Sequence, residues 1–76
     1  MKKYFFDLAT PKACFYDYQG QALAELQEAR RVAQLVAHDL ETTGAFDWAG
    51  AAVNVRDVFG TTLFSVPVQE LELLAA

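Results

Sequence analysis

The sequence predicts a small α+β domain: an antiparallel sheet of about four strands with one long helix packed on one face, in the order ββαββ. Two strand-like runs precede a long helical stretch and two more follow it, and a turn signal joins the members of each pair. The chain has 76 residues, which is enough for one hydrophobic core but not for two. We therefore expect residues 1–76 to form a single domain.

The first pair of strands is expected over residues 3–8 and 13–18, with a turn around Pro11 between them. Both runs are rich in aromatic residues and have the length of a strand. Alternation along the first run places three side chains on one face, namely Tyr4, Phe6 and Leu8. Phe5 and Asp7 are then expected on the opposite face.

The motif Asp-x-x-Gly-x-x-Leu occurs twice, at residues 17–23 and 57–63. Asp is favoured at the first position of a type I turn, where its carboxylate accepts backbone N–H groups. Gly at the fourth position accepts the left-handed backbone angles that follow such a turn. The turn residues predicted in this way are Asp17, Gly20, Asp57 and Gly60.

The second motif lies between two clear strand patterns, over residues 51–57 and 61–68, so it is expected to close a hairpin. The first motif is expected to form the same kind of turn at the end of the second strand. After it, residues 21–23 either form a short extended piece or enter the helix directly.

Residues 24–41 form the expected helix, because they contain good helix formers and neither Gly nor Pro. Apolar residues at spacings of three and four give one stripe that faces the sheet, consisting of Leu26, Ala29, Ala33, Val36, Ala37 and Leu40. The Thr-Thr-Gly sequence at residues 42–44 ends the helix. Trp48 is expected to pin the following loop to the core, with stacking on a ligand as the alternative.

Val32 and Leu35 fall outside this stripe, on a helix face that is otherwise charged. We interpret this apolar pair as a candidate partner surface, the alternative being two scattered exposed side chains, which are common. A second candidate is the sheet face away from the helix, through Phe5, Phe15 or residues 62, 64 and 66.

Few residues offer catalytic chemistry. Asp17 and Asp57 could form an acid–base pair, but their glycine partners explain both carboxylates as turn residues. Cys14 and His38 could form a catalytic pair, although His38 belongs to the outer helix face and Cys14 to a strand, where a buried thiol is expected. A single cysteine excludes a zinc site with several cysteines, and the dispersed glycines form no phosphate loop. We expect a protein that is not an enzyme, with no metal and no cofactor.

The net charge of −4 and the pI of about 4.6 argue against nonspecific binding to a phosphate backbone, so a nucleic-acid partner is not expected. The alternative is stacking of bases on aromatic residues of adjacent strands, namely Tyr4, Phe6, Phe15, Tyr16 and Tyr18. Packing against the helix explains one aromatic face without any ligand.

The hydrophobic share of 54% is high for so short a chain, and small domains leave much of their surface exposed. Some apolar side chains must therefore face water or a partner, and self-association is expected. One cysteine fits a reducing compartment. Asp7 interrupts the short apolar run after Lys3, and no run approaches the roughly 20 apolar residues of a membrane span. We expect a cytoplasmic protein without a signal peptide.

Four segments together carry a resemblance to a known family. They are YFFDL at residues 4–8, the first Asp-x-x-Gly-x-x-Leu motif, the helix LQEARRVAQLVAHDL, and V-x-V-x-D-x-x-G-x-x-L-x-x-V-P in the final hairpin. From Tyr4 to about Leu71 the chain resembles short, uncharacterised bacterial proteins that share a domain of unknown function and are frequent in rhizobia-like alphaproteobacteria. Members usually have an acidic residue where this chain has Ala22, and a glycine in the first turn where it has Pro11. The resemblance implies no activity, substrate or catalytic residue.

A weaker resemblance concerns architecture. A tyrosine-rich first strand, a hairpin and an alanine-containing helix are similar to Hic-type antitoxins, small proteins that bind a toxin. Together these observations favour a small protein-interaction module, expected to form a homodimer. The alternative is an antitoxin-like or regulatory partner of another protein.

Overall fold

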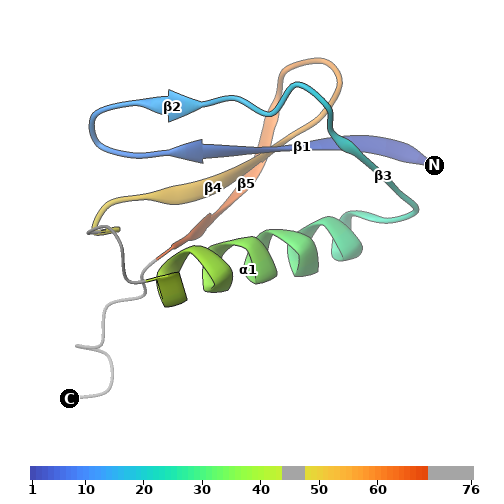
Figure 1. The fold of residues 1–76 in the computed structure, drawn as a ribbon. Coiled ribbons are helices and arrows are strands. Elements are labelled where there is room, and N and C mark those ends of the chain that lie inside the picture. The colour runs from blue at the N-terminus through green and yellow to red at the C-terminus, as the bar shows by residue number, and fades with distance from the viewer. Residues whose placement is uncertain (44–47, 69–76) are drawn as a thin grey trace.

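A computed structural model describes residues 1–43 and 48–68, and in these residues it contains five strands and one helix (Figure 1). The elements are β1 (Lys2–Ala9), β2 (Cys14–Phe15), β3 (Gln21–Leu23), α1 (Leu26–Thr43), β4 (Ala52–Arg56) and β5 (Thr62–Pro67). The predicted α+β class is confirmed. The additional strand is the short extended piece at residues 21–23, which the sequence left open.

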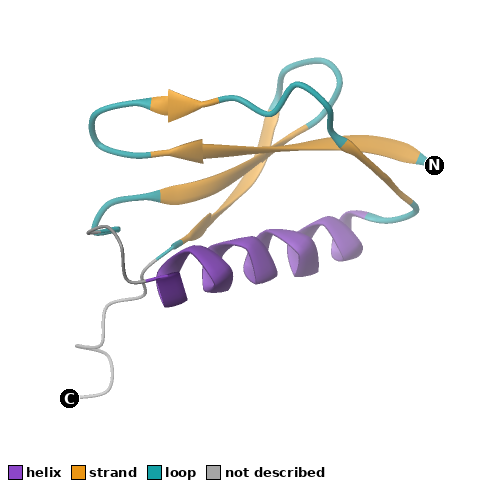
Figure 2. Cartoon of the chain, in the orientation of Figure 1, coloured by secondary structure: helices purple, strands orange, loops and turns teal. Residues whose placement is uncertain are grey.

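The sheet is antiparallel throughout, and β1 pairs with three of the other strands. Along one edge of β1 lie first β2 and then β3, while its other edge pairs with β4. β5 pairs with β4 and forms the outer strand on that side. Figure 2 shows α1 lying along one face of this sheet. We call the opposite face the open face.

The core lies between α1 and the sheet. Three helix alanines spaced by four residues are almost completely buried, with exposed fractions of 0–4%: Ala29, Ala33 and Ala37. Side chains this small let the helix backbone approach the sheet closely. The strands contribute Tyr4, Val53 and Val55 as buried side chains, and Phe6, Leu8, Phe64 and Val66 as half-buried ones packed against them.

The helix begins two residues later than the pattern predicted. The Glu28 carboxylate accepts hydrogen bonds from the N–H groups of Ala24 and Glu25, at 3.0 and 3.1 Å, and so caps the first turn at Leu26. The predicted helix end at Gly44 and the loop residues 46 and 47 lie outside the described residues, as does the chain after Val68. The helix that the structure describes is not long and apolar enough to cross a membrane.

The helix faces differ from the expectation at two positions. Val32 is half-buried and packs against the core, so it does not belong to an exposed pair with Leu35, which is 64% exposed. Leu26 was expected in the core stripe but is 45% exposed, because in the first turn of α1 it borders a depression of the surface. The candidate partner surface on α1 is therefore reduced to Leu35.

Candidate functional site

The first Asp-x-x-Gly motif forms a bulge in the strand edge beside β1. Leu8 pairs with Phe15 in β2, and Tyr4 pairs with Gln21 in β3. Five residues (16–20) therefore face three residues of β1 (5–7). Both β2 and β3 run antiparallel to β1, so the chain keeps its direction through the motif, whereas a hairpin turn at the end of the second strand was expected. The bulge also explains why β2 ends at Phe15.

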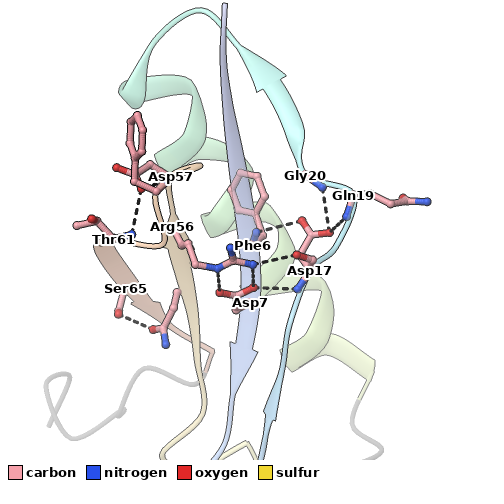
Figure 3. A network of polar contacts seen from close by, with 11 residues as sticks. Phe6, Asp7, Asp17, Gln19, Gly20, Arg56, Asp57, Thr61 and Ser65 are labelled. Atoms are coloured by element: carbon pink, nitrogen blue, oxygen red, sulfur yellow. Dashed lines mark hydrogen bonds and ion pairs between the residues drawn. The ribbon is translucent and has the colours of Figure 1, made fainter.

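The Asp17 carboxylate takes the place of the strand partner that β1 lacks at the bulge. The N–H of Phe6 points to this edge and donates to Asp17 Oδ2 at 3.1 Å. The other carboxylate oxygen, Oδ1, accepts the N–H groups of Gln19 and Gly20 at 3.0 and 3.1 Å (Figure 3). One side chain thus satisfies three backbone donors at the interruption of the ladder.

These contacts decide the ionisation of Asp17. Partial burial raises the pKa of its carboxyl, but the hydrogen bonds from Gly20, Phe6 and Gln19 and the positive charge of Arg56 outweigh it. The pKa of Asp17 is therefore lowered, because backbone donors stabilise the charged form.

Gly20 lies where any side chain would be strained. Its φ of +72° is in the left-handed region that favours glycine. A Cβ at this position would also lie 2.9 Å from the ring of Phe5, so the ring packs directly onto the glycine backbone.

An ion pair between a buried carboxylate and a half-buried arginine ties the bulge to the centre of the sheet. Asp7 lies on the open face and is only 3% exposed. Its carboxylate accepts two hydrogen bonds from Arg56 of β4, one from Nε at 2.8 Å and one from Nη2 at 3.2 Å. Nη2 also donates to the carbonyl oxygen of Asp17 at 3.0 Å, and the N–H of Asp17 donates to Asp7 Oδ1 at 2.8 Å. Figure 3 shows the resulting chain of contacts across β1, β4 and the bulge.

The guanidinium of Arg56 contacts aromatic rings in addition to its hydrogen-bond partners. Its central carbon lies 4.6 Å from the centre of the Phe5 ring and 6.0 Å from that of Tyr16. The hydrogen bond to Asp7 raises the pKa of Arg56 although desolvation opposes the charge. With its charge matched by Asp7, this arginine is a structural clamp rather than a site for an anion. Sequence reasoning missed the clamp, because its two residues are 49 positions apart and only the strand register brings them together.

The second Asp-x-x-Gly motif reverses the chain between β4 and β5. The N–H of Gly60 donates to the carbonyl oxygen of Asp57 at 3.1 Å, and Gly60 has a φ of +86°. The Asp57 carboxylate accepts the N–H groups of Phe59 and Thr61 at 2.9 and 3.0 Å. The carboxylates of both motifs are thus engaged with backbone donors in their own loops.

The residues considered for catalysis lie in different places. Asp17, His38 and Asp57 line three separate depressions of the surface. Cys14 is exposed at the edge strand β2, so the expected burial of this thiol was wrong. It lies beside Tyr16, whose pKa it raises through a hydrogen bond. In the part of the chain that the structure describes, His, Cys, Asp and Glu form no group of three that could hold a metal ion.

The aromatic residues considered for base stacking do not share one face. Tyr4 and Phe6 pack against the core beneath α1. Phe15 pairs with Leu8 and lies beside Trp48 in a groove at the end of β1, whereas Tyr16 lies near Arg56 on the open face. Trp48 is half-buried against the core, as expected for a residue that pins its loop. The expected apolar open face is not formed by Phe64 and Val66, because both pack toward α1.

The family assignment rests on the match of most of the sequence to one family model. Residues 3–69 match DUF6894, a domain of unknown function. The chain belongs to the DUF6894 family. No curated protein and no solved structure shows significant similarity to it. The family description names no activity, and the features of this DUF6894 domain that bear on function are those of its own surface.

A groove at the hairpin end of the DUF6894 domain gathers several exposed apolar side chains. It has a volume of about 530 Å³ and lies between the start of β1, the first turn of α1 and the β4–β5 hairpin. Five apolar side chains that line it are 39–92% exposed: Met1, Leu26, Val58, Phe59 and Leu63. The sequence did not predict this groove, because its apolar residues come from three separate segments.

Proposed function

We propose that this DUF6894 chain is a small, non-enzymatic protein-interaction module that self-associates as a homodimer. The observation that carries the proposal is the apolar groove at the hairpin end. Contiguous exposed apolar surface is costly in water, and on soluble proteins it marks interaction sites. Self-association is the simplest use, because every copy of the chain brings the same apolar surface.

The polar groups support a binding role rather than catalysis. The Asp17 and Asp57 carboxylates are held by backbone N–H groups, and Asp7 is paired with Arg56. A catalytic acid or base needs a free proton position facing a substrate. The groove itself is lined mainly by apolar side chains, together with Lys2, Lys3 and Asp57.

The molar mass in solution tests this proposal. Size-exclusion chromatography with light scattering, run over a concentration series, should give about twice the chain mass of 8.4 kDa at the upper end. The substitution Leu63→Glu should shift the series toward the monomer, because it places a charge in the groove. Leu35→Glu introduces the same charge at a more exposed apolar site on α1, away from the groove, and should leave the mass unchanged.

A chain that remains monomeric throughout the series would overturn self-association. The alternative, an antitoxin-like or regulatory partner of another protein, would then be favoured. A dimer that Leu35→Glu dissociates and Leu63→Glu does not would move the interface to the outer face of α1.

A further inference from the structure

We infer that the second copy binds at the outer edge of β5, so that two β5 strands pair antiparallel about a two-fold axis at Ser65 and the two sheets become one. The inference rests on the proposed self-association and names the surface that carries it. Its starting point is the position of β5 at the end of the sheet, where in the described residues only β4 pairs with it.

The hydrogen-bond alternation of the strand identifies which backbone groups point away from β4. The N–H of Val68 donates to the carbonyl oxygen of Ala51 at 3.0 Å, and these residues continue the β4–β5 register. In an antiparallel pair every second residue directs its N–H and C=O to the same neighbour. Phe64 and Val66 therefore bond to β4, while Ser65 and Pro67 direct their backbone groups away from the sheet. Pro67 carries no N–H, which fits its outward orientation.

The outer edge of β5 is only partly protected against pairing. Natural proteins protect edge strands with charged side chains, prolines and bulges. β5 has the sequence Thr-Leu-Phe-Ser-Val-Pro and contains no charged residue, in a chain with a net charge of −4. Its register shift lies next to Leu63 and its proline is the last residue, so the centre of the strand at Ser65 is left unprotected.

A two-fold axis at Ser65 makes the edge complementary to itself. The outward N–H and C=O of Ser65 would bond to the same groups of Ser65 in the second copy. Phe64 would lie opposite Val66 of the second copy, and both are half-buried side chains on the α1 side of the sheet. Their pairing would extend the core from one chain to the other. The missing N–H of Pro67 would fall at the end of the paired segment, where it costs least.

The same register connects the edge with the apolar groove. Leu63 lines the groove, and Pro67 of the second copy would lie opposite it. The edge of β5 has six residues and is about 20 Å long, and a sheet layer is about 10 Å thick. Pairing two such edges would therefore bury only about 400 Å² of surface, counted over both copies. A stable interface needs roughly 1,000 Å². The adjoining groove is the apolar surface available to supply part of the difference.

Disulfide trapping tests the register directly. In a Cys14→Ser background, which removes the exposed native thiol, Ser65→Cys should cross-link the dimer in oxidised glutathione. The two Cα atoms of an antiparallel pair lie about 5.5 Å apart, within the range that a disulfide spans. Thr62→Cys is the matched control on the same strand. Its two copies would be offset by six residues, or about 20 Å, and should not cross-link.

A dimer by molar mass in which Ser65→Cys fails to cross-link, or in which Thr62→Cys cross-links equally fast, would overturn the inference and leave self-association in place. Ser65→Lys provides a measurement that does not depend on oxidation. It would set two like charges opposite each other and should raise the dissociation constant at least tenfold. A dissociation constant equal to that of the wild type would also overturn the inference. Circular dichroism of each variant verifies that it is folded.

Discussion

Asp17 and Gly20 show how a turn motif can be used without turning the chain. The carboxylate caps the loop at Gln19 and Gly20, as the spacing predicted, and in addition it accepts the N–H of Phe6. The local role of both residues could be predicted from four positions of sequence. The contact with β1 could not, because it depends on how the strands on either side of the motif pair with β1.

The two motif glycines should differ in their tolerance of a side chain. Gly20→Ala combines a left-handed φ with a Cβ placed 2.9 Å from the Phe5 ring, and we expect it to lower the free energy of unfolding by about 3 kcal/mol. Gly60→Ala has a similar φ but nothing within 4 Å of the added Cβ, so its cost should be about 1–2 kcal/mol. Urea unfolding of both variants measures the difference. Equal losses would show that the Phe5 contact is unimportant.

The lowered pKa of Asp17 should make the fold sensitive to acid. Because the carboxyl binds protons less readily in the folded chain than in the unfolded one, its stabilisation is complete above about pH 5. It is lost as the pH falls through the folded-state pKa. Asp17→Asn should therefore lower the stability at pH 7 by about 1–2 kcal/mol and flatten the decline at acidic pH. Urea unfolding at several pH values between 7 and 3 measures this.

Gln19→Ala is the control for Asp17→Asn, since it changes the same loop and keeps the carboxylate. It should retain the pH profile of the wild type. If Asp17→Asn retained that profile as well, the account of the carboxylate as a charged cap would be wrong.

At the scale of elements, the hydrophobic period located α1 to within two residues at each end and identified its alanine stripe. It misplaced Val32, which packs against the core, because the period of a single helix does not show how wide a face the sheet covers. The second strand was expected over residues 13–18, but β2 covers only Cys14–Phe15, and the bulge at residues 16–20 separates it from β3. Interruptions of this kind depend on pairing with β1 and leave little signal in local composition.

Truncation of Val32 and truncation of Leu35 should change the free energy of unfolding by clearly different amounts. Val32→Ala removes methyl groups packed against the core and should lower the free energy of unfolding by about 1–2 kcal/mol. Leu35→Ala removes a larger side chain that is 64% exposed and should change it by less than about 0.5 kcal/mol. Thermal or urea unfolding measures both. A loss for Val32→Ala as small as that for Leu35→Ala would contradict the packing of Val32 and restore the exposed pair that the sequence predicted.

For the whole molecule, the class and the order of the elements followed from the sequence, but the arrangement of the strands did not. That arrangement places Asp7 against Arg56, and it gathers Met1, Leu26, Phe59 and Leu63 at one end. It also leaves β5 on the outside. The proposed interface therefore depends on long-range pairing, and no segment taken alone indicates it.

Amide hydrogen exchange at Ser65 tests self-association through β5 most directly. The N–H of Ser65 points away from β4, so it should exchange without protection in a dilute, monomeric sample. At a concentration where light scattering gives the mass of a dimer, the same amide should be protected at least tenfold. The amide of Val66, which is directed to β4 in either state, should be protected at both concentrations. An unprotected Ser65 amide in a sample with the mass of a dimer would contradict the account.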